Sequence, residues 1–316
     1  DLIRSRGLGD VYKRQITNGT LDLRGSDGLG NFNLVATDFL MTGGTLEAGS
    51  SVAHTVSGTW NETGGTFTPI EGTFIFDGTG DITQSLGNNF FNLTIAAGTK
   101  TAGSNLNIDG ALLIDQATSE LDMSGNKLEL AGDFTMSNGT FTAGNSVDHT
   151  VSGSWTETGG TFQPAAGTFT FDGTGSITQK ADETNNFFNL TIAAGTKTAG
   201  SNLNIDGALL IDQATSELDM SGNKLELAGD FTMSNGTFTA GSSDAHTVGG
   251  SWTENGGVFQ PSSGKFTFSG PGNTLQTLGS NYFKDFTISA AGNYTTLSDI
   301  DIDGNSTITG TLDIGC

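Results

Sequence analysis

The sequence predicts an all-β fold, and among all-β folds it favours an elongated β-solenoid built from repeats of about 95 to 97 residues. Residues 88–144 recur letter for letter at 185–241, an offset of 97. Short stretches alternate apolar and polar residues, which indicates β-strands. No stretch shows the 3.6-residue period of a helix, so helix is expected to be essentially absent.

Each predicted strand has one apolar and one polar face and ends in a turn. Examples are NLNIDG at 105, KLELAG at 127, TFTFDG at 168 and DFTISA at 285. Leu, Ile or Phe fill one face, while Asn, Asp, Glu or Thr fill the other, and Gly or Asp-Gly turns the chain.

Two architectures fit this pattern. Tandem β-sandwich domains would place about seven strands in each repeat. A β-solenoid would instead wind two or three strands into each coil of roughly 20 residues and stack the coils about 4.8 Å apart. The absence of linkers favours the solenoid, as does the Thr-Phe recurrence, which predicts internal aromatic ladders of Phe67, Phe74 and Phe76 and of Phe162, Phe169 and Phe171.

The recurring histidine divides the chain into units. Residues 16–53 are expected to be the tail of a preceding repeat, 54–148 and 149–245 two repeat units, and 246–316 an incomplete one, with 16–316 forming one continuous solenoid. Residues 1–15 lack the pattern and resemble a translated sequencing adaptor. We therefore expect this segment to be non-native and exclude it from the fold.

Charge and composition exclude several classes of protein. Without residues 1–15 the chain keeps 8 basic and 32 acidic residues, a net charge of −24. Nucleic acid is not expected as a partner, because phosphate binding needs clustered Lys and Arg. No segment approaches 18 consecutive apolar residues, so no transmembrane segment is expected. The single cysteine, Cys316, has no partner for an internal disulfide.

The motif HTVSGSW and its variants place a histidine and a tryptophan in each unit. With about five coils per unit, His54, His149 and His246 would stand roughly 24 Å apart and share no metal. Each is expected at a strand start, with the tryptophan at the edge of its coil. The alternative is that Trp60, Trp155 and Trp252 form exposed platforms on which sugars stack.

DIDIDGN, residues 299–305, resembles the first half of a calcium loop. Asp299, Asp301 and Asp303 fall at ligand positions, but position twelve is Gly310 instead of a bidentate Glu. Ile300 and Ile302 alternate as in a strand. We expect an outward polar strand face, with weak Ca²⁺ binding as the alternative and no other cofactor.

Neither catalysis nor ice binding is expected. The few lysines lie mostly at repeat-equivalent positions, and a site copied in every unit is unusual for an enzyme. Outward threonine pairs such as Thr140 and Thr142 resemble those of ice-binding solenoids, but they are not expected to recur at coil spacing.

The order GTFTFDGTGSITQ, NNFFNLTIAAG and NLNIDGALLI resembles the strand repeats of large bacterial surface and secreted proteins, akin to autotransporter passengers and filamentous-haemagglutinin-like adhesins. The resemblance covers residues 16–316. It implies a right-handed parallel β-helix and a structural or adhesive role, as a stalk or passenger at the cell surface or outside the cell. Missing flanking regions would anchor it, and its partner would be a host or environmental surface or glycan. A carbohydrate-binding β-helix surface is the alternative, and a polysaccharide-active enzyme is less expected. The resemblance supplies no catalytic residue.

Overall fold

The computed structural model describes residues 13–24, 31–50, 53–145, 147–181, 185–243 and 245–315. Every regular element in these ranges is a β-strand, and none is a helix. Residues 1–12 of the segment expected to be non-native, and Cys316, lie outside the described ranges. The chain divides into two compact units, Asp1–His149 with Glu157–Ala165 and Thr150–Thr156 with Ala166–Cys316.

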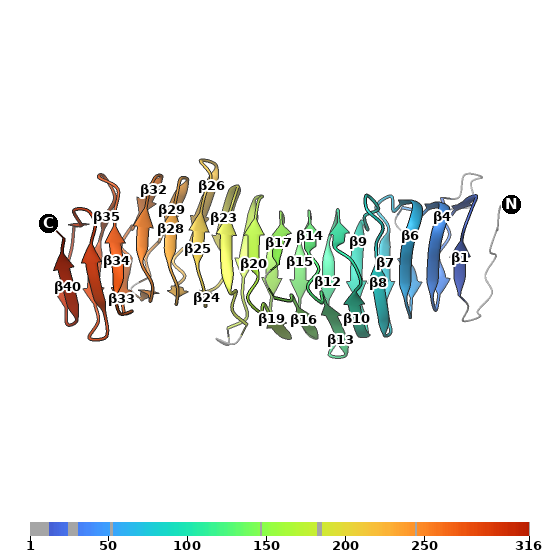
Figure 1. The fold of residues 1–316 in the computed structure, drawn as a ribbon, viewed down its shortest axis with the longest axis horizontal. Helices are drawn as coiled ribbons and strands as arrows, with labels where there is room; N and C mark the ends of the chain where they lie inside the picture. Colours follow the sequence, from blue (N-terminus) through green and yellow to red (C-terminus); the bar gives the residue numbers. More distant parts are fainter. Residues whose placement is uncertain are drawn as a thin grey trace. The chain divides into compact units, whose positions relative to one another are not determined.

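The first unit is built from three sheets of parallel strands, and Figure 1 labels many of them. The first sheet contains β1 (Arg14–Ile16), β4 (Phe39–Glu47), β6 (Trp60–Thr68), β8 (Gly80–Thr83), β10 (Gly98–Ala102), β13 (Ser119–Asp122), β16 (Thr140–Thr142) and β19 (Thr161–Gln163), with β2 (Thr20–Asp22) beside β4. The second contains β3 (Val35–Ala36), β5 (Ala53–Val56), β7 (Thr73–Phe76), β9 (Asn92–Ile95), β12 (Leu112–Ile114) and β15 (Phe134–Met136). The third contains β11 (Leu106–Ile108), β14 (Leu128–Leu130) and β17 (Asp148–Val151).

The second unit repeats this arrangement. One sheet contains β18 (Trp155–Glu157), β21 (Gly175–Thr178), β23 (Gly195–Ala199), β26 (Ser216–Asp219), β29 (Thr237–Thr239) and β32 (Val258–Gln260). Another contains β20 (Thr168–Phe171), β22 (Asn189–Ile192), β25 (Leu209–Ile211), β28 (Phe231–Met233), β31 (Trp252–Glu254), β34 (Asn273–Gln276), β37 (Asn293–Thr296) and β40 (Thr311–Ile314). The last two contain β24 (Leu203–Ile205), β27 (Leu225–Leu227), β30 (His246–Val248), β33 (Lys265–Phe268), β36 (Asp285–Ile288) and β39 (Ser306–Ile308), and β35 (Tyr282–Phe283) with β38 (Asp301–Ile302).

Each unit is therefore a β-solenoid, as predicted, and tandem sandwiches are excluded because the paired strands are parallel. Equivalent positions of neighbouring coils lie 18 to 25 residues apart, from Asn293↔Thr311 to Arg14↔Phe39, with Phe74↔Leu93 and Leu106↔Leu128 between these limits. The register places apolar residues on apolar residues. The last residues of the segment excluded from the fold, Arg14 and Gln15, pair with Phe39 and Leu40 in the first coil.

The 97-residue repeat is not a whole number of coils. Four register steps in the second unit lead from Phe169 through Leu190, Leu209 and Phe231 to Trp252. Trp155, the equivalent of Trp252, lies 14 residues before Phe169, which is two-thirds of a coil. A repeat thus spans 4⅔ coils, where about five were expected, and advances about 22 Å at 4.8 Å per coil.

Equivalent strands of successive repeats consequently lie in different sheets. In the first unit His54 lies in β5 of the second sheet and its equivalent His149 in β17 of the third. In the second unit Trp155 and Trp252 also lie in different sheets. Within one unit, two successive copies of a surface feature therefore lie on different sheets.

The core is filled by aromatic clusters that reach across the coil. Phe67, Phe74 and Phe76 are buried, as predicted. They do not stack as one ladder, because strands on different sides of the coil bring them together around Trp60, whose ring lies 5.4 Å from Phe67, 5.3 Å from Phe74 and 6.4 Å from Phe76. Such tilted and edge-on contacts are favourable aromatic geometries.

Glycines shape the corners between strands. Gly160 has φ of 83°, and a Cβ there would lie 2.7 Å from the carbonyl oxygen of Gly139 in the coil below. Gly139 is itself left-handed, with φ of 77°. Only glycine meets both the backbone and the space requirement at such a corner.

A row of single threonines does recur at coil spacing. Thr247, Thr267, Thr287 and Thr307 are paired in register along β30, β33, β36 and β39. The expectation concerned Thr-x-Thr pairs and is confirmed for Thr140 and Thr142, because Thr142 pairs with Gln163 in the next coil. The row of single threonines is a different pattern, which that expectation did not cover.

Candidate functional site

The chemically richest cluster is a buried Trp-x-Glu pair at the start of a repeat. Trp60 and Glu62 lie two residues apart on β6, so both side chains point into the core. The indole Nε1 of Trp60 donates to Oε1 of Glu62 at 2.6 Å. Oε2 of Glu62 accepts from Nδ2 of Asn88 at 3.0 Å and from the backbone N–H of Ser85 at 3.3 Å. The carboxylate thus ties its own coil to the corner of the next one.

The same network occurs in the second unit. Trp252 donates to Glu254 at 2.7 Å, and Glu254 accepts from Nδ2 of Asn281 at 2.8 Å and from the backbone N–H of Leu278 at 2.9 Å. Burial raises the pKa of Glu254, and it raises the pKa of Glu62 to about 7. The N–H groups that donate to these carboxylates lower the pKa values, but burial has the larger effect. Both side chains are about 1% exposed. These carboxyl groups are structural and have no route to a substrate.

The three histidines are core residues with a fixed hydrogen bond. The backbone N–H groups of Leu34, Leu128 and Leu225 donate to Nδ1 of His54, His149 and His246 at 3.0, 3.1 and 3.1 Å. An accepting Nδ1 requires the neutral tautomer that carries its proton on Nε2. Burial accordingly lowers the pKa of His54, and lowers those of His149 and His246 to about 4.

The tryptophans do not form sugar-stacking platforms. Trp60, Trp155 and Trp252 are each 0% exposed, so no pyranose ring can reach an indole face. They do not lie at the edges of their coils either, because the interior of each coil is wide enough to take the whole ring. Phe231, for example, stacks on Trp252 at 3.8 Å.

Two buried lysines complete the interior. Lys100 is 0% exposed, donates from Nζ to the backbone oxygens of Ser57 (3.1 Å) and Gly58, and lies 5.2 Å from the centroid of Phe76. Burial lowers its pKa to about 8. Lys197 is bound in the same way in the second unit, to Ser152 and Gly153. Sequence reasoning missed this role. A signal was present, because in GTKTAG the lysine lies two residues before the buried Ala102 and so faces the same side of the strand.

A tyrosine occupies the equivalent position in the third repeat. The hydroxyl of Tyr294 lies 3.2 Å from the backbone oxygen of Val248 and 3.1 Å from that of Gly250, and accepts from the backbone N–H of Gly270 at 3.2 Å. In all three repeats the side chain satisfies carbonyl groups that converge at an inner corner. This requirement explains why a lysine can be buried there.

The Asp299, Asp301 and Asp303 side chains are all exposed and alternate with the less exposed Ile300 and Ile302, as in an outward strand face. Asp303 forms an ion pair with Lys284 at 2.7 Å. Across the described ranges, no group of three His, Cys, Asp or Glu residues has an arrangement that could hold a metal ion.

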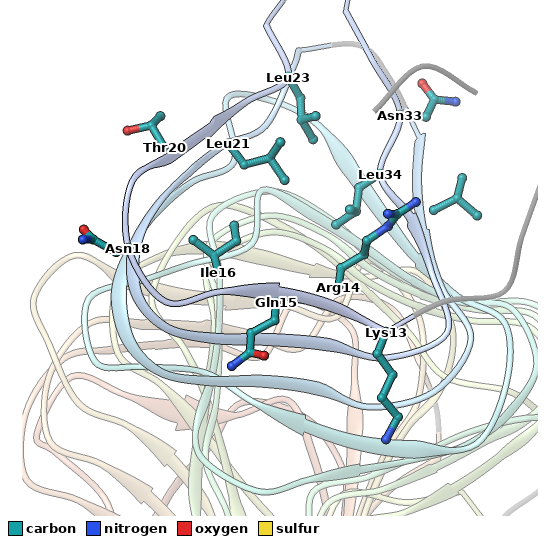
Figure 2. Close-up of a pocket in the computed structure, with 11 residues that line it drawn as sticks. Lys13, Arg14, Gln15, Ile16, Asn18, Thr20, Leu21, Leu23, Asn33 and Leu34 are labelled. Carbon is teal, nitrogen blue, oxygen red and sulfur yellow. The ribbon is translucent and has the colours of Figure 1, made fainter. Parts of the chain in front are cut away.

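Two depressions in the described surface are candidate binding sites. One, of about 230 Å³, is the open mouth of the first coil, where Ile16, Leu21 and Leu34 point inward and Arg14 extends toward Leu34 (Figure 2). The other, of about 390 Å³, lies over β24, β27 and β30. Its carboxylates are already engaged, Asp206 by Nδ2 of Asn186 at 2.8 Å and Glu226 by Lys224.

Comparisons with known proteins give no relative from which a function can be transferred. No family model, no curated protein and no solved structure matches the chain. Among the described residues, there is no helix with the length and apolar character needed to cross a membrane.

Proposed function

We propose that this chain is a structural repeat region, a stalk or adhesive passenger, of a large bacterial cell-surface or secreted protein, and that it has no catalytic activity. Flanking regions would anchor it, and its outer faces would meet a host or environmental surface or a glycan. The proposal rests on the β-solenoid architecture of both units and on where each repeat places its reactive side chains.

One observation carries the proposal: the histidine, tryptophan and glutamate that recur in all three repeats are buried in the core. The Trp60–Glu62 pair, His54 and Lys100 are each about 0–1% exposed, and their polar atoms bind backbone or side-chain groups of neighbouring coils. Repetition of these residues supports the stacking of coils. A repeated active site would need them exposed.

The 4⅔-coil period also suits a structural role better than a one-sided binding role. Equivalent residues within one unit lie in different sheets, as His54 and His149 do. Within a unit, copies of one surface feature in successive repeats therefore do not form a single adhesive row. With the three indoles in the interior, the carbohydrate-binding alternative loses the stacking platforms expected of them.

The test is a binding and turnover screen on beads that carry the purified chain. A stalk should bind no glycan or extracellular-matrix protein on an array with a Kd below about 100 µM, a free energy of roughly −5.5 kcal/mol. An adhesive passenger should bind one class of partner, more weakly after deletion of residues 145–241 because fewer copies remain. Release of reducing sugar from a polysaccharide, abolished by substitution of a surface carboxylate, would contradict the proposal.

A further inference from the structure

The depression of about 390 Å³ over β24, β27 and β30 lies on the outer face of the second unit. Three residues run across it in register, because Asn204 pairs with Glu226 and Glu226 pairs with Thr247. Neighbouring coils are about 4.8 Å apart, so these side chains form a polar row roughly 9.6 Å long. Beside the row, Ala228 and Gly249 carry little or no side chain and leave room for a ligand.

Asn204 is the residue of this depression that coil stacking does not explain. Its neighbours on β24, Leu203 and Ile205, are buried in the core, so the Asn204 side chain turns outward and lines the depression. Asn204 is nevertheless only 8% exposed. Among the described residues, neither its Oδ1 nor its Nδ2 has a hydrogen-bond partner. A buried amide without a partner lowers stability, and a ligand in the depression would supply the missing hydrogen bonds.

The other polar groups of the depression also keep hydrogen-bonding capacity. Asp206 accepts from Nδ2 of Asn186 through Oδ1 at 2.8 Å, and Glu226 binds Lys224 through Oε1. Within the described ranges, Oδ2 of Asp206, Oε2 of Glu226 and the hydroxyl of Thr247 make no hydrogen bond. The depression therefore offers two carboxylate acceptors, an amide, and a hydroxyl that both donates and accepts.

This set of groups suits an uncharged sugar better than an ion. Lys224 offsets one of the two carboxylates, which weakens the attraction for a metal ion or a basic peptide, while the remaining negative charge repels an acidic polysaccharide. Sugar hydroxyls donate and accept, as the depression does. Phe188, which is 36% exposed, lies beside Asp206, because its backbone oxygen accepts from Gly207 at 2.6 Å. Its ring provides an apolar face at this end of the depression.

We propose that this depression binds an uncharged oligosaccharide, with Asn204, Asp206, Glu226 and Thr247 as its hydrogen-bonding partners and the sugar chain lying along the polar row. The inference rests on the proposed function in its adhesive form, since a stalk needs no such contact. The site binds sugar without cleaving it. It also differs from the indole platforms expected from the sequence, because its partners are amide, carboxylate and hydroxyl groups.

The experiment is isothermal titration calorimetry of the whole chain with five uncharged probes: cellohexaose, maltohexaose, mannohexaose, xylohexaose and chitohexaose. We expect at least one of them to bind with a Kd below about 100 µM. A hyaluronan hexasaccharide, which carries carboxylates, should bind at least about tenfold more weakly than that probe. Absence of binding by all five uncharged probes would overturn the proposal, and so would binding of hexalysine alone or equally tight binding of hyaluronan.

Matched variants separate sugar binding from stability. Asn204→Leu keeps the size of the side chain and removes the unpartnered amide, so it should weaken binding of the best probe at least about tenfold while Tm stays unchanged or rises. Glu226→Gln should also weaken binding about tenfold. Glu217→Gln removes the same charge from the outer face of β26, where Glu217 accepts from Thr196 at 2.9 Å, and should leave the affinity unchanged.

The outcomes distinguish this inference from the proposed function. Unchanged affinity in both Asn204→Leu and Glu226→Gln would overturn the sugar site and leave the stalk function standing. An equal loss of affinity in Glu217→Gln would overturn the site as well, because the charge would then act without regard to position. Release of reducing sugar from a probe would instead contradict the non-catalytic function.

Discussion

Deletion of one coil should leave a folded protein. Removal of residues 106–127 joins Asn105 to Leu128, and Leu128 is already the register partner of Leu106. LNIDGALLI is then replaced by LELAGDFTM, with apolar residues at the same inward positions. Each coil of a solenoid contacts only its neighbours, so the shortened stack closes over the gap.

The size of the effect follows from the number of residues removed. Twenty-two residues at roughly 0.7 kcal/mol each predict a calorimetric unfolding enthalpy lower by about 15 kcal/mol near 60 °C. The urea m-value should fall in the same proportion as the chain length, by roughly 7%, because it scales with the surface exposed on unfolding. Far-ultraviolet circular dichroism should keep its β-sheet shape.

A smaller deletion is the control. Removal of residues 112–122 deletes only half a coil, taking Leu112, Ile114 and Leu121 from the core. In the shortened chain, Ser124 and Gly125 would take the place of β12 residues in the sheet, although they have positive φ of 49° and 82°. The 11-residue deletion should therefore destabilise the protein more than the 22-residue one. If the 22-residue variant aggregates or loses its β-sheet signal, the reasoning is refuted.

Four further predictions concern core packing, two effects of pH, and calcium. Trp60→Ala should lower the free energy of unfolding by about 3–5 kcal/mol in urea titrations, because it empties the core and removes a donor from Glu62; a loss below 1 kcal/mol would contradict the packing. Because the pKa of Glu62 is raised to about 7, its contribution to stability is full below pH 4.5 and is lost as pH rises through about 7. The free energy of unfolding of the unmodified protein should therefore decline between pH 5 and 8, and Glu62→Gln should remove up to about 3 kcal/mol of this decline. The lowered pKa values of His149 and His246 act in the opposite sense, because their contribution to stability is present above pH 6.5 and is lost as pH falls through about 4. Urea midpoints measured from pH 4 to 8 should therefore fall at the acidic end of this range. Millimolar Ca²⁺ should shift Tm by no more than about two degrees; a ten-degree shift abolished by Asp301→Asn would show a calcium site.

Much of the fold could be predicted from local alternation and from the repeat. Strand stretches such as TFTFDG become β20 with Phe169 and Phe171 inward, as their parity requires. The phase of the repeat could not be predicted, because coil length varies from 18 to 25 residues and only the register shows where each coil closes. For the same reason the aromatic clusters could not be predicted, because they depend on which strands face one another across a coil.

The candidate sites were harder to predict because composition does not reveal burial. A tryptophan two residues from a glutamate gives the same pattern on an exposed sugar platform as in a core network. What separates the two is the third partner, Asn88, which lies 26 residues from Glu62 and belongs to the next coil. For Lys100 the parity signal was present, but a buried lysine is acceptable only because carbonyl groups of Ser57 and Gly58 converge there.

The most direct test of the stacked-coil structure is cysteine cross-linking along the threonine row of the second unit, in a Cys316→Ser background. Register pairs such as Thr267 and Thr287 should have Cα atoms about 4.8 Å apart, within the 4.4–6.8 Å range that a disulfide spans. Thr247 and Thr287 are two coils apart, roughly 9.6 Å, and beyond that range. Rapid oxidation of the Thr267→Cys/Thr287→Cys protein, with no cross-link in Thr247→Cys/Thr287→Cys, is the predicted result. Failure of the adjacent pair to cross-link, or equal cross-linking of both pairs, would contradict the β-solenoid.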